Sequence, residues 1–248
     1  MKFIALPAPS MTGFSGHEIP TRQLSFYLAM EDYVLCNLLD PSNFTDAFFF
    51  WQVGPSVIFG RNQVAENEVN LDYCREHGVQ VFRRKSGGGC VYADRDNLML
   101  SFVTTEKNVG FAFNRFINMI LLVLRKMGVE ATGTSHNDIL IGNKKVCGTA
   151  CRTTAKGCVV HSTMLYDTNM EHMLHTITPS REKLQQKGIQ SVRQRITFLK
   201  DHTPLTLDEV KTLIRNTLCV GERVLTVAEV AEIELLEKTS ERAVRQPV

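Results

Sequence analysis

The chain of 248 residues is 44% hydrophobic and 22% charged, an ordinary balance for a globular protein with one large domain or two small ones. Its formal net charge of +2 is too small for a general nucleic-acid-binding protein, so any basic site must be local. The sequence has no apolar run of membrane-spanning length, and Pro7 and Pro9 interrupt the apolar opening segment, which is a poor secretory signal. We therefore expect a cytoplasmic protein.

The seven cysteines are an odd number and include no C-x-x-C pair, which argues against a zinc site or a disulfide framework. We expect free thiols in a reducing compartment. Cys151 and Cys158 flank a predicted hairpin turn and could face each other, but a lasting bridge is not expected there.

The first predicted element is a helix over 21–39, with Thr21 as its candidate N-cap. The aromatic and β-branched segments 47–53 and 56–60 are predicted to form a strand pair around Gly54-Pro55. A short helix near 69–78 ends at Gly78. Three more strands are then expected at 79–84, 90–94 and 97–105. A glycine-rich loop separates the first two, and a turn at Arg95-Asp96 separates the last two.

A largely buried helix is predicted over 111–128, with Gly128 as its stop. A three-stranded meander follows, with turns at Gly142-Asn143 and at 155–157. Helices are predicted at 180–187, 206–217 and 226–239. The last ten residues are expected to form a frayed tail. Strands mixed with flanking helices indicate an α+β fold with a mixed, largely antiparallel sheet.

The segment RRKSGGGC, residues 83–90, is the first candidate site. Its three glycines lie between two strands, which excludes a P-loop and a dinucleotide-binding fingerprint, because both need a helix after the glycines. The backbone N–H groups could form an anion-binding concavity. A mobile hairpin with solvated basic flanks is the alternative interpretation.

Three weaker candidates lie further along the chain. The lysine pair in GNKKVCGTA, 142–150, is also common turn chemistry, and His136 with Asp138 gives too few ligands for a closed metal site. His161 lies among apolar residues and could be a hydrogen-bonded core histidine. A triad of Ser86, His161 and Asp138 can be written down, but no G-x-S-x-G elbow supports it.

Five blocks in series resemble the lipoate–protein ligase family, within the wider biotin and lipoate ligase superfamily. The resemblance runs from about Gly54 to Leu199, and each block is separated from the next by a sensible gap. The blocks are PSVIFGRNQ, RRKSGGGCVYADRDN, NDILIGNKKVCGTA, VVHSTML and KGIQSVRQRITFL.

The resemblance implies one catalytic domain over 1–248, with a core at 54–199 and a helical C-terminal segment and tail at 200–248. We expect no counterpart of the small C-terminal accessory domain that bacterial members of the family commonly carry. The implied reaction uses ATP and Mg²⁺ to convert lipoate into lipoyl-AMP, followed by transfer to a lysine of a carrier. The implied carriers are lipoyl domains of 2-oxo acid dehydrogenase E2 subunits and the glycine cleavage H protein, and a separate accessory-domain protein is a further expected partner.

The resemblance also implies residue roles. Lys145 matches the family's essential lysine, Asp138 could hold Mg²⁺ against phosphates, and the last block matches a loop that covers the adenylate. Residues implied to contact substrate or adenylate are Arg61, Arg84, Ser86, Gly87, Gly88, Gly89, Val91, Tyr92, Asn137, Asp138, Gly148, Thr149, Ala150, His161, Thr163, Lys187, Gly188, Ser191, Val192 and Arg193.

Four positions depart from the family pattern: Ala93, Asp96, His136 and Ser162. Two other interpretations therefore stay open. One is a transferase that moves lipoyl or octanoyl from a preformed adenylate or a carrier thioester, for which Cys147 and Cys151 beside Lys145 would be candidate nucleophiles. The other is a non-catalytic protein that binds an acyl-adenylate or the carrier.

Overall fold

The computed structural model describes residues 1–7, 22–134, 138–178 and 195–245, and the side chains of these residues up to 239. None of the helices in these ranges is long and apolar enough to cross a membrane. The 180–187 helix expected from sequence lies outside the described residues.

The larger of two sheets forms the centre of the described structure, in the order β11-β1-β2-β6-β10-β9-β8-β7. β1 pairs in parallel with β2 and β11, and the pairs from β2 through to β7 are antiparallel. The strands are β1 (Lys2–Ala5), β2 (Asp46–Trp51), β6 (Asn97–Thr104), β7 (Thr132–Gly133), β8 (Asp138–Ile141), β9 (Lys144–Thr154), β10 (Gly157–Leu165) and β11 (Glu222–Val224).

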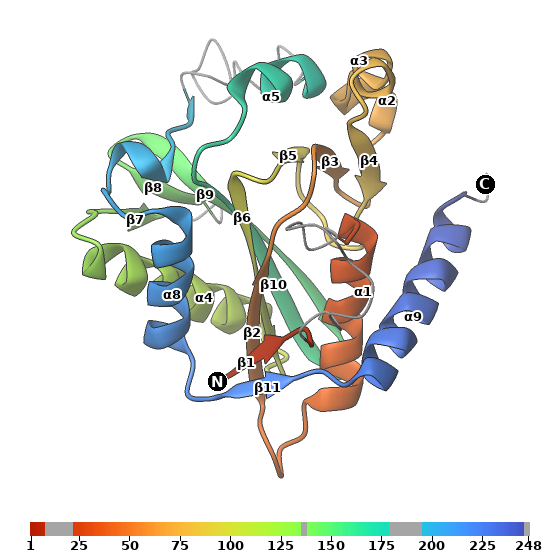
Figure 1. The fold of residues 1–248 in the computed structure, drawn as a ribbon, viewed down its shortest axis with the longest axis vertical. Coiled ribbons are helices and arrows are strands. Elements are labelled where there is room, and N and C mark those ends of the chain that lie inside the picture. Colours follow the sequence, from red (N-terminus) through yellow and green to blue (C-terminus); the bar gives the residue numbers. More distant parts are fainter. Residues whose placement is uncertain (8–21, 135–137, 179–194, 246–248) are drawn as a thin grey trace, which may run out of the picture.

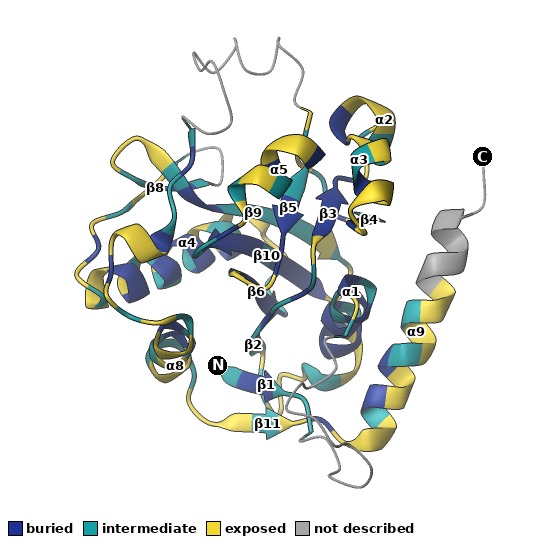
Figure 2. Ribbon diagram, turned by 45° about the horizontal axis from the view of Figure 1, so that its top comes forward, coloured by how far each residue is buried: buried dark blue, intermediate teal, exposed yellow. Residues whose placement is uncertain are grey.

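Helices cover both faces of this sheet (Figure 1). α4 (Val109–Lys126) and α8 (Leu207–Leu218) pack on one face. The other face is covered by α9 (Val227–Arg245) and by α1 (Leu24–Tyr33), which continues as a π-helical turn, Val34–Leu38. Figure 2 shows the buried strands between these helix layers and the exposed outer side of α9.

Strand β6 explains why both faces need a cover, because every one of its residues is buried. Leu98, Leu100 and Phe102 point into the core under α4, while Met99 and Val103 point into the core under α1. Successive side chains of a strand alternate between faces, so a strand with apolar side chains on both faces must lie between two layers. The polar residues Asn97 and Thr104 form the ends of the strand, and Ser101, in its middle, shares the α1 face.

A second, smaller sheet has the order β4-β3-β5 and lies beside the α1 face of the large sheet. β3 (Ser56–Phe59) pairs in parallel with β4 (Gln80–Arg83) and antiparallel with β5 (Val91–Ala93). The short helices α2 (Ala65–Glu68), α3 (Leu71–Glu76) and α5 (Met170–Thr176) lie close to it, and a 3₁₀ turn spans Leu199–Asp201. A third apolar cluster fills this region.

The structure confirms the α+β class, the antiparallel meander β8-β9-β10 and the helices near 69–78, 111–128 and 206–217. The predicted pairing of 47–53 with 56–60 is wrong. Both edges of β2 are occupied, by β1 and β6, so β3 has no free edge there and instead nucleates the second sheet.

Two helix boundaries also differ from the prediction. The first helix begins at Leu24 with Gln23, and not Thr21, in the N-cap position. The final helix continues to Arg245, so the expected frayed tail is wrong for 239–245. Val230 and Ile233 anchor this helix in the α1 core, and Glu237 accepts a 2.5 Å hydrogen bond from Ser25.

The capping box at the start of α8 gives a test of local stability. Thr206 Oγ1 accepts from the Glu209 backbone N–H, and the Glu209 carboxylate accepts from the Thr206 N–H. Thr206→Ala should lower the free energy of unfolding by about 1 kcal/mol in urea titrations. Thr212→Ala, in the middle of the same helix, is the control and should leave it within about 0.5 kcal/mol. Equal losses in both variants would contradict the capping role.

Candidate functional site

A cavity of about 270 Å³ lies between the glycine loop and the strands β9 and β10. It combines apolar side chains from α1, β2, β3 and β6 with charged groups from β8, β9 and the segment after residue 194. Its lining residues are Leu28, Trp51, Ile58, Arg84, Gly88, Gly89, Cys90, Val91, Met99, Asp138, Lys145, Gly148, Thr149, Ala150, His161, Ser162, Thr163 and Arg195.

Asp138 is the centre of the charged part of this cavity. Lys145 Nζ lies 2.7 Å from one carboxylate oxygen, and Arg195 Nη2 lies 2.8 Å from the other. The Lys145 side chain crosses Gly148, where a Cβ atom would come within 2.4 Å of Nζ. Glycine at 148 is therefore required if the ammonium is to occupy this position.

The end of the fifth block, from Arg195 onward, also lies beside Lys145 and Asp138. Ile196 forms an isolated parallel bridge with Lys145, and the Thr197 N–H donates to the Lys145 carbonyl oxygen over 2.9 Å. These contacts place Arg195 beside the lysine. The third and fifth blocks, some fifty residues apart in sequence, therefore meet at one carboxylate.

Arg84 organises the glycine loop from within. Its side chain is only 5% exposed, and it donates to the carbonyl oxygens of Gly87 and Gly89 over 2.8 Å each and to that of Ile58 over 3.1 Å. Gly88 has φ of +97°, a conformation that residues with a Cβ rarely adopt. Burial lowers the pKa of the Arg84 guanidinium to about 10, which still leaves it positively charged at neutral pH.

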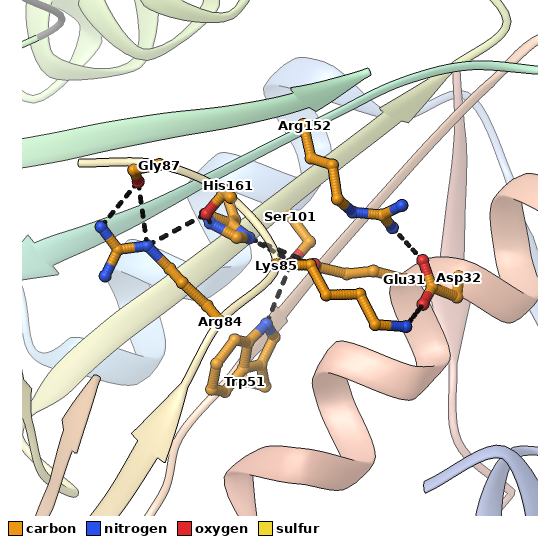
Figure 3. A network of polar contacts seen from close by, with 10 residues as sticks. Glu31, Asp32, Trp51, Arg84, Lys85, Gly87, Ser101, Arg152 and His161 are labelled. Carbon is orange, nitrogen blue, oxygen red and sulfur yellow. Dashed lines mark hydrogen bonds and ion pairs between the residues drawn. The ribbon is translucent and has the colours of Figure 1, made fainter. Parts of the chain in front are cut away.

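A chain of hydrogen bonds ties this loop to the large sheet and to α1 (Figure 3). Ser86 Oγ lies 2.7 Å from His161 Nε2 and accepts from Arg84 Nε over 3.0 Å. His161 Nδ1 lies 3.1 Å from the buried carboxylate of Glu31. The histidine is thus hydrogen-bonded at both nitrogens and also lines the cavity.

The triad of Ser86, His161 and Asp138 is not formed. Glu31 is the carboxylate that faces His161, while Asp138 is engaged by Lys145 and Arg195. No pattern in the sequence pointed to Glu31, because its contact with His161 spans 130 positions.

Neighbouring charges hold the outer side of the loop. Lys85 Nζ lies 2.7 Å from Asp32 on α1, and Arg152 pairs with the other oxygen of that carboxylate. Arg83 donates to the carbonyl oxygens of Arg61 and Gln63. Lys85 keeps more than half of its side chain exposed, so the rim of the loop stays basic.

The cysteines near Lys145 do not present a reactive thiol. Cys147 is fully buried in the core under α4, and Cys151 packs against the same cluster. Burial raises the pKa of each thiol, and that of Cys90 at the cavity wall, to about 12. A thiol is nucleophilic only when ionised, which weighs against a thioester mechanism on Cys147 or Cys151.

Ten of the twenty substrate-contact residues implied by the resemblance line the cavity, as does Lys145: Arg84, Gly88, Gly89, Val91, Asp138, Gly148, Thr149, Ala150, His161 and Thr163. Arg61, Ser86 and Gly87 belong to the loop and its neighbourhood but do not line it, and Tyr92 is buried in the cluster under the small sheet. Six others lie outside the described residues: Asn137, Lys187, Gly188, Ser191, Val192 and Arg193.

Two of the four departures from the family pattern, Ala93 and Asp96, do not line the cavity. Ala93 is buried in the α1 core, and the Asp96 carbonyl oxygen accepts from the Asp167 N–H. Ser162 does line the cavity, and His136 lies outside the described residues.

Comparison with known proteins decides the family. A profile of the lipoyl protein ligase A/B catalytic domain matches residues 23–219. The chain belongs to this family.

Among relatives, lipoate–protein ligase 1 of Staphylococcus aureus is 35% identical over 85% of this chain, and the lipoate-protein ligase LplJ of Bacillus subtilis is 34% identical over 85%. The chain spans 62% and 63% of the lengths of these two relatives.

Solved structures show the same fold. A lipoate-protein ligase A bound with ATP superposes with a TM-score of 0.78 at 23% identity, covering 96% of this chain and 94% of that one. The ligase of an archaeal lipoylation system from Thermoplasma acidophilum gives 0.77 at 26% identity, covering 96% and 91%.

Gly60, directly after β3, is a structural requirement of the site that the family blocks do not single out. A Cβ at this position would lie 2.1 Å from the Gly88 carbonyl oxygen and 3.2 Å from the Gly87 carbonyl carbon. Gly60→Ala should therefore push the glycine loop away and lower the free energy of unfolding by about 1–3 kcal/mol, measured in urea. Gly87→Ala is the control, because a Cβ there meets no atom within 4 Å. Similar stability of both variants would contradict the close packing.

The buried thiols give a second test. At pH 8 a thiol with a pKa of about 12 is ionised in roughly one molecule in ten thousand. Iodoacetamide should therefore modify the exposed Cys36 first and leave Cys90, Cys147 and Cys151 largely unmodified, as followed by peptide mass spectrometry. Modification of Cys147 as fast as Cys36 would contradict this assignment and restore the thioester mechanism.

Proposed function

We propose that this chain activates lipoate with ATP to lipoyl-AMP and transfers the lipoyl group to a lysine of a lipoyl carrier domain. The observation that carries the proposal is the position of Lys145. Its ammonium stands in a cavity that also holds the glycine loop and an apolar wall from Leu28, Trp51 and Met99. Relatives of this chain bear the name lipoate–protein ligase, and one solved structure of this fold is bound with ATP.

The first half-reaction needs a fixed cation. The lipoate carboxylate attacks the α-phosphorus of ATP, a mixed anhydride forms, and pyrophosphate leaves. Two anions must approach each other, and a preorganised ammonium lowers this barrier, typically by about 3–4 kcal/mol. The Lys145 ammonium is a compact point charge suited to contact both a lipoate carboxylate oxygen and an α-phosphate oxygen of ATP. The ion pair with Asp138 fixes its position beforehand.

The second half-reaction needs the same cavity with a different nucleophile. The neutral amine of the carrier lysine attacks the acyl carbonyl carbon of lipoyl-AMP, an amide bond forms, AMP leaves with the electron pair of the broken acyl–oxygen bond, and the amine proton passes to water. Lys145 can stay on the phosphate oxygen as the charge develops there. The apolar wall would hold the acyl tail in both steps.

Asp138 is the residue that the resemblance offers for Mg²⁺. Both of its carboxylate oxygens are engaged by cations, and the described residues contain no cluster of three groups able to hold a metal. Asp138 in this arrangement does not fit as a metal ligand. Mg²⁺ entering with ATP would take its ligands from phosphate oxygens and water, and none of the steps above depends on Asp138 as a ligand.

The basic rim of the glycine loop suits the carrier. Arg61 and Arg83 are exposed beside the loop, and more than half of the Lys85 side chain is exposed. Lipoyl domains are commonly acidic, so these cations would meet a complementary surface. The E2 lipoyl domain and the glycine cleavage H protein are the proposed partners, and the archaeal ligase similar in fold is described together with its E2 lipoyl domain.

Transfer from a preformed lipoyl-AMP, without activation, is the second candidate function. This chain matches 62% and 63% of the lengths of the two relatives. Activation of lipoate can require parts of those relatives that transfer from lipoyl-AMP does not, so activation and transfer must be tested separately. A non-catalytic role in binding the adenylate would leave Lys145 dispensable.

Lys145→Ala separates the two catalytic functions from the non-catalytic one. Asp138 would keep its bond to Arg195, so the variant should fold. We expect lipoate-dependent ATP–pyrophosphate exchange and carrier modification from synthetic lipoyl-AMP to fall by about a hundredfold or more. Lys144→Ala is the matched control: its side chain is exposed and points away on the strand, so both activities should stay within about twofold.

The wild type separates the remaining cases. Exchange with lipoate and ATP supports the complete ligase, whereas carrier modification from lipoyl-AMP alone supports the transferase. Full activity of folded Lys145→Ala would remove this lysine from the mechanism.

A further inference from the structure

A continuous hydrogen-bonded chain, which we name the Trp51–Arg84 relay, joins five parts of the fold. It runs from Trp51 on β2 through Ser101 on β6, Glu31 on α1 and His161 on β10 to Ser86 and Arg84 in the glycine loop. Trp51 Nε1 donates to Ser101 Oγ over 3.0 Å, and Ser101 donates to Glu31 over 2.7 Å. Each link lies in the interior, since Glu31, Ser86 and Ser101 are all at most 3% exposed.

The protons along the relay are fully accounted for with a neutral histidine. Glu31 is an acceptor, so His161 donates from Nδ1 and its Nε2 carries a lone pair. Nε2 then accepts from the Ser86 hydroxyl. This leaves the Ser86 oxygen free to accept from Arg84 Nε, which is always a donor. The carboxylate at one end thus selects the direction of every bond that follows.

The geometry excludes a hydrolase mechanism for the same residues. His161 is bonded to a serine and to a carboxylate, as in a catalytic triad, but Ser86 is only 3% exposed and does not line the cavity. Ser86 Oγ also faces Arg84 rather than open space. The hydroxyl therefore fixes the loop and has no access to a substrate carbonyl.

Arg84 is where the relay meets the ligand-facing surface. With Nε held by Ser86, the guanidinium plane is fixed, and its Nη2 donates to the carbonyl oxygens of Gly87 and Gly89. These bonds turn the loop carbonyls inward, toward Arg84. We propose that Glu31 and His161 are positioning residues that act through Ser86 and Arg84 to hold the glycine loop in the shape that accepts the acyl-adenylate. This inference rests on the proposed function.

Loss of the Glu31 carboxylate has a defined consequence. Without an acceptor at Nδ1, the imidazole can place its proton on Nε2, and it then donates to Ser86 instead of accepting from it. The Ser86 hydroxyl proton loses its acceptor, and the contact that fixes Arg84 weakens. Glu31→Leu should produce this change, whereas Glu31→Gln keeps an acceptor oxygen at the same place.

The protein carries its own reporter for the test. Trp51 is its single tryptophan, it lines the cavity, and its N–H is the first donor of the relay. Its fluorescence can therefore follow binding of a non-hydrolysable lipoyl-AMP analogue without any measurement of activity.

The test is a double-mutant cycle on the dissociation constant of that analogue. Glu31→Leu and Ser86→Ala should each weaken binding by about tenfold, the loss of one buried hydrogen bond. The double variant should stay within about twofold of the weaker single variant, because both changes break the same path. Glu31→Gln should recover binding to within about threefold of wild type.

Asp32→Asn is the matched control on the same helix. Asp32 holds Lys85, the neighbour of Arg84, but it does not contact the relay, so binding should change by less than about twofold. Multiplying effects in the double variant, to about a hundredfold, would overturn the proposal. So would an effect of Asp32→Asn equal to that of Glu31→Leu.

A ligand-free measurement separates this inference from the proposed function. In ¹⁵N spectra of the imidazole groups, with His161 assigned by loss of its signals in His161→Gln, the wild type should show the proton on Nδ1 and Glu31→Leu should show it on Nε2. A wild type that binds no analogue would defeat the proposed function, and the tautomer result would still decide the relay. A proton on Nε2 in the wild type would overturn it.

Discussion

The register of β10 between β6 and β9 is the constraint on which the site depends. His161 lies opposite Ser101 on one side and Ala150 on the other, while Thr163 lies opposite Gly148, the glycine beneath Lys145. A slip of one residue would turn every side chain of β10 to the other face of the sheet. His161 would then face the core under α4, far from Glu31. The buried apolar residues on both faces hold the register that the chemistry needs.

Charge compensation shapes the rest of the cavity. Three charged groups around the site have several partners each: Asp138 has two cations, Asp32 has two, and Arg84 has four acceptors on the chain. Burying an isolated charge is costly, so such groups persist only where their hydrogen bonds are satisfied. The consequence is a preorganised site, in which Lys145 and the glycine loop hold their positions without a ligand.

Local patterns predicted much of the fold because they depend on neighbours in sequence. The apolar run of β6, the periodicity of α4 and the turns of the β8-β9-β10 meander all produce elements where the sequence places them. The partner of β3 could not be predicted in the same way. Whether β3 can pair with β2 depends on whether the edges of β2 are already occupied. β1, at the N-terminus, occupies one of these edges.

Sequence by itself determined the chemical inventory of the site: the three glycines, Lys145, Asp138 and His161 stand in blocks whose order indicates the family. Only the tertiary structure decided the partners. Glu31 reaches His161 across 130 positions, and Arg195 reaches Asp138 across 57. No local pattern marks Glu31, since a carboxylate on a helix is an ordinary surface choice, and the block that contains Arg195 does not reveal its partner. Their roles follow from burial, because a charge taken out of water must find its counterpart wherever the fold brings one.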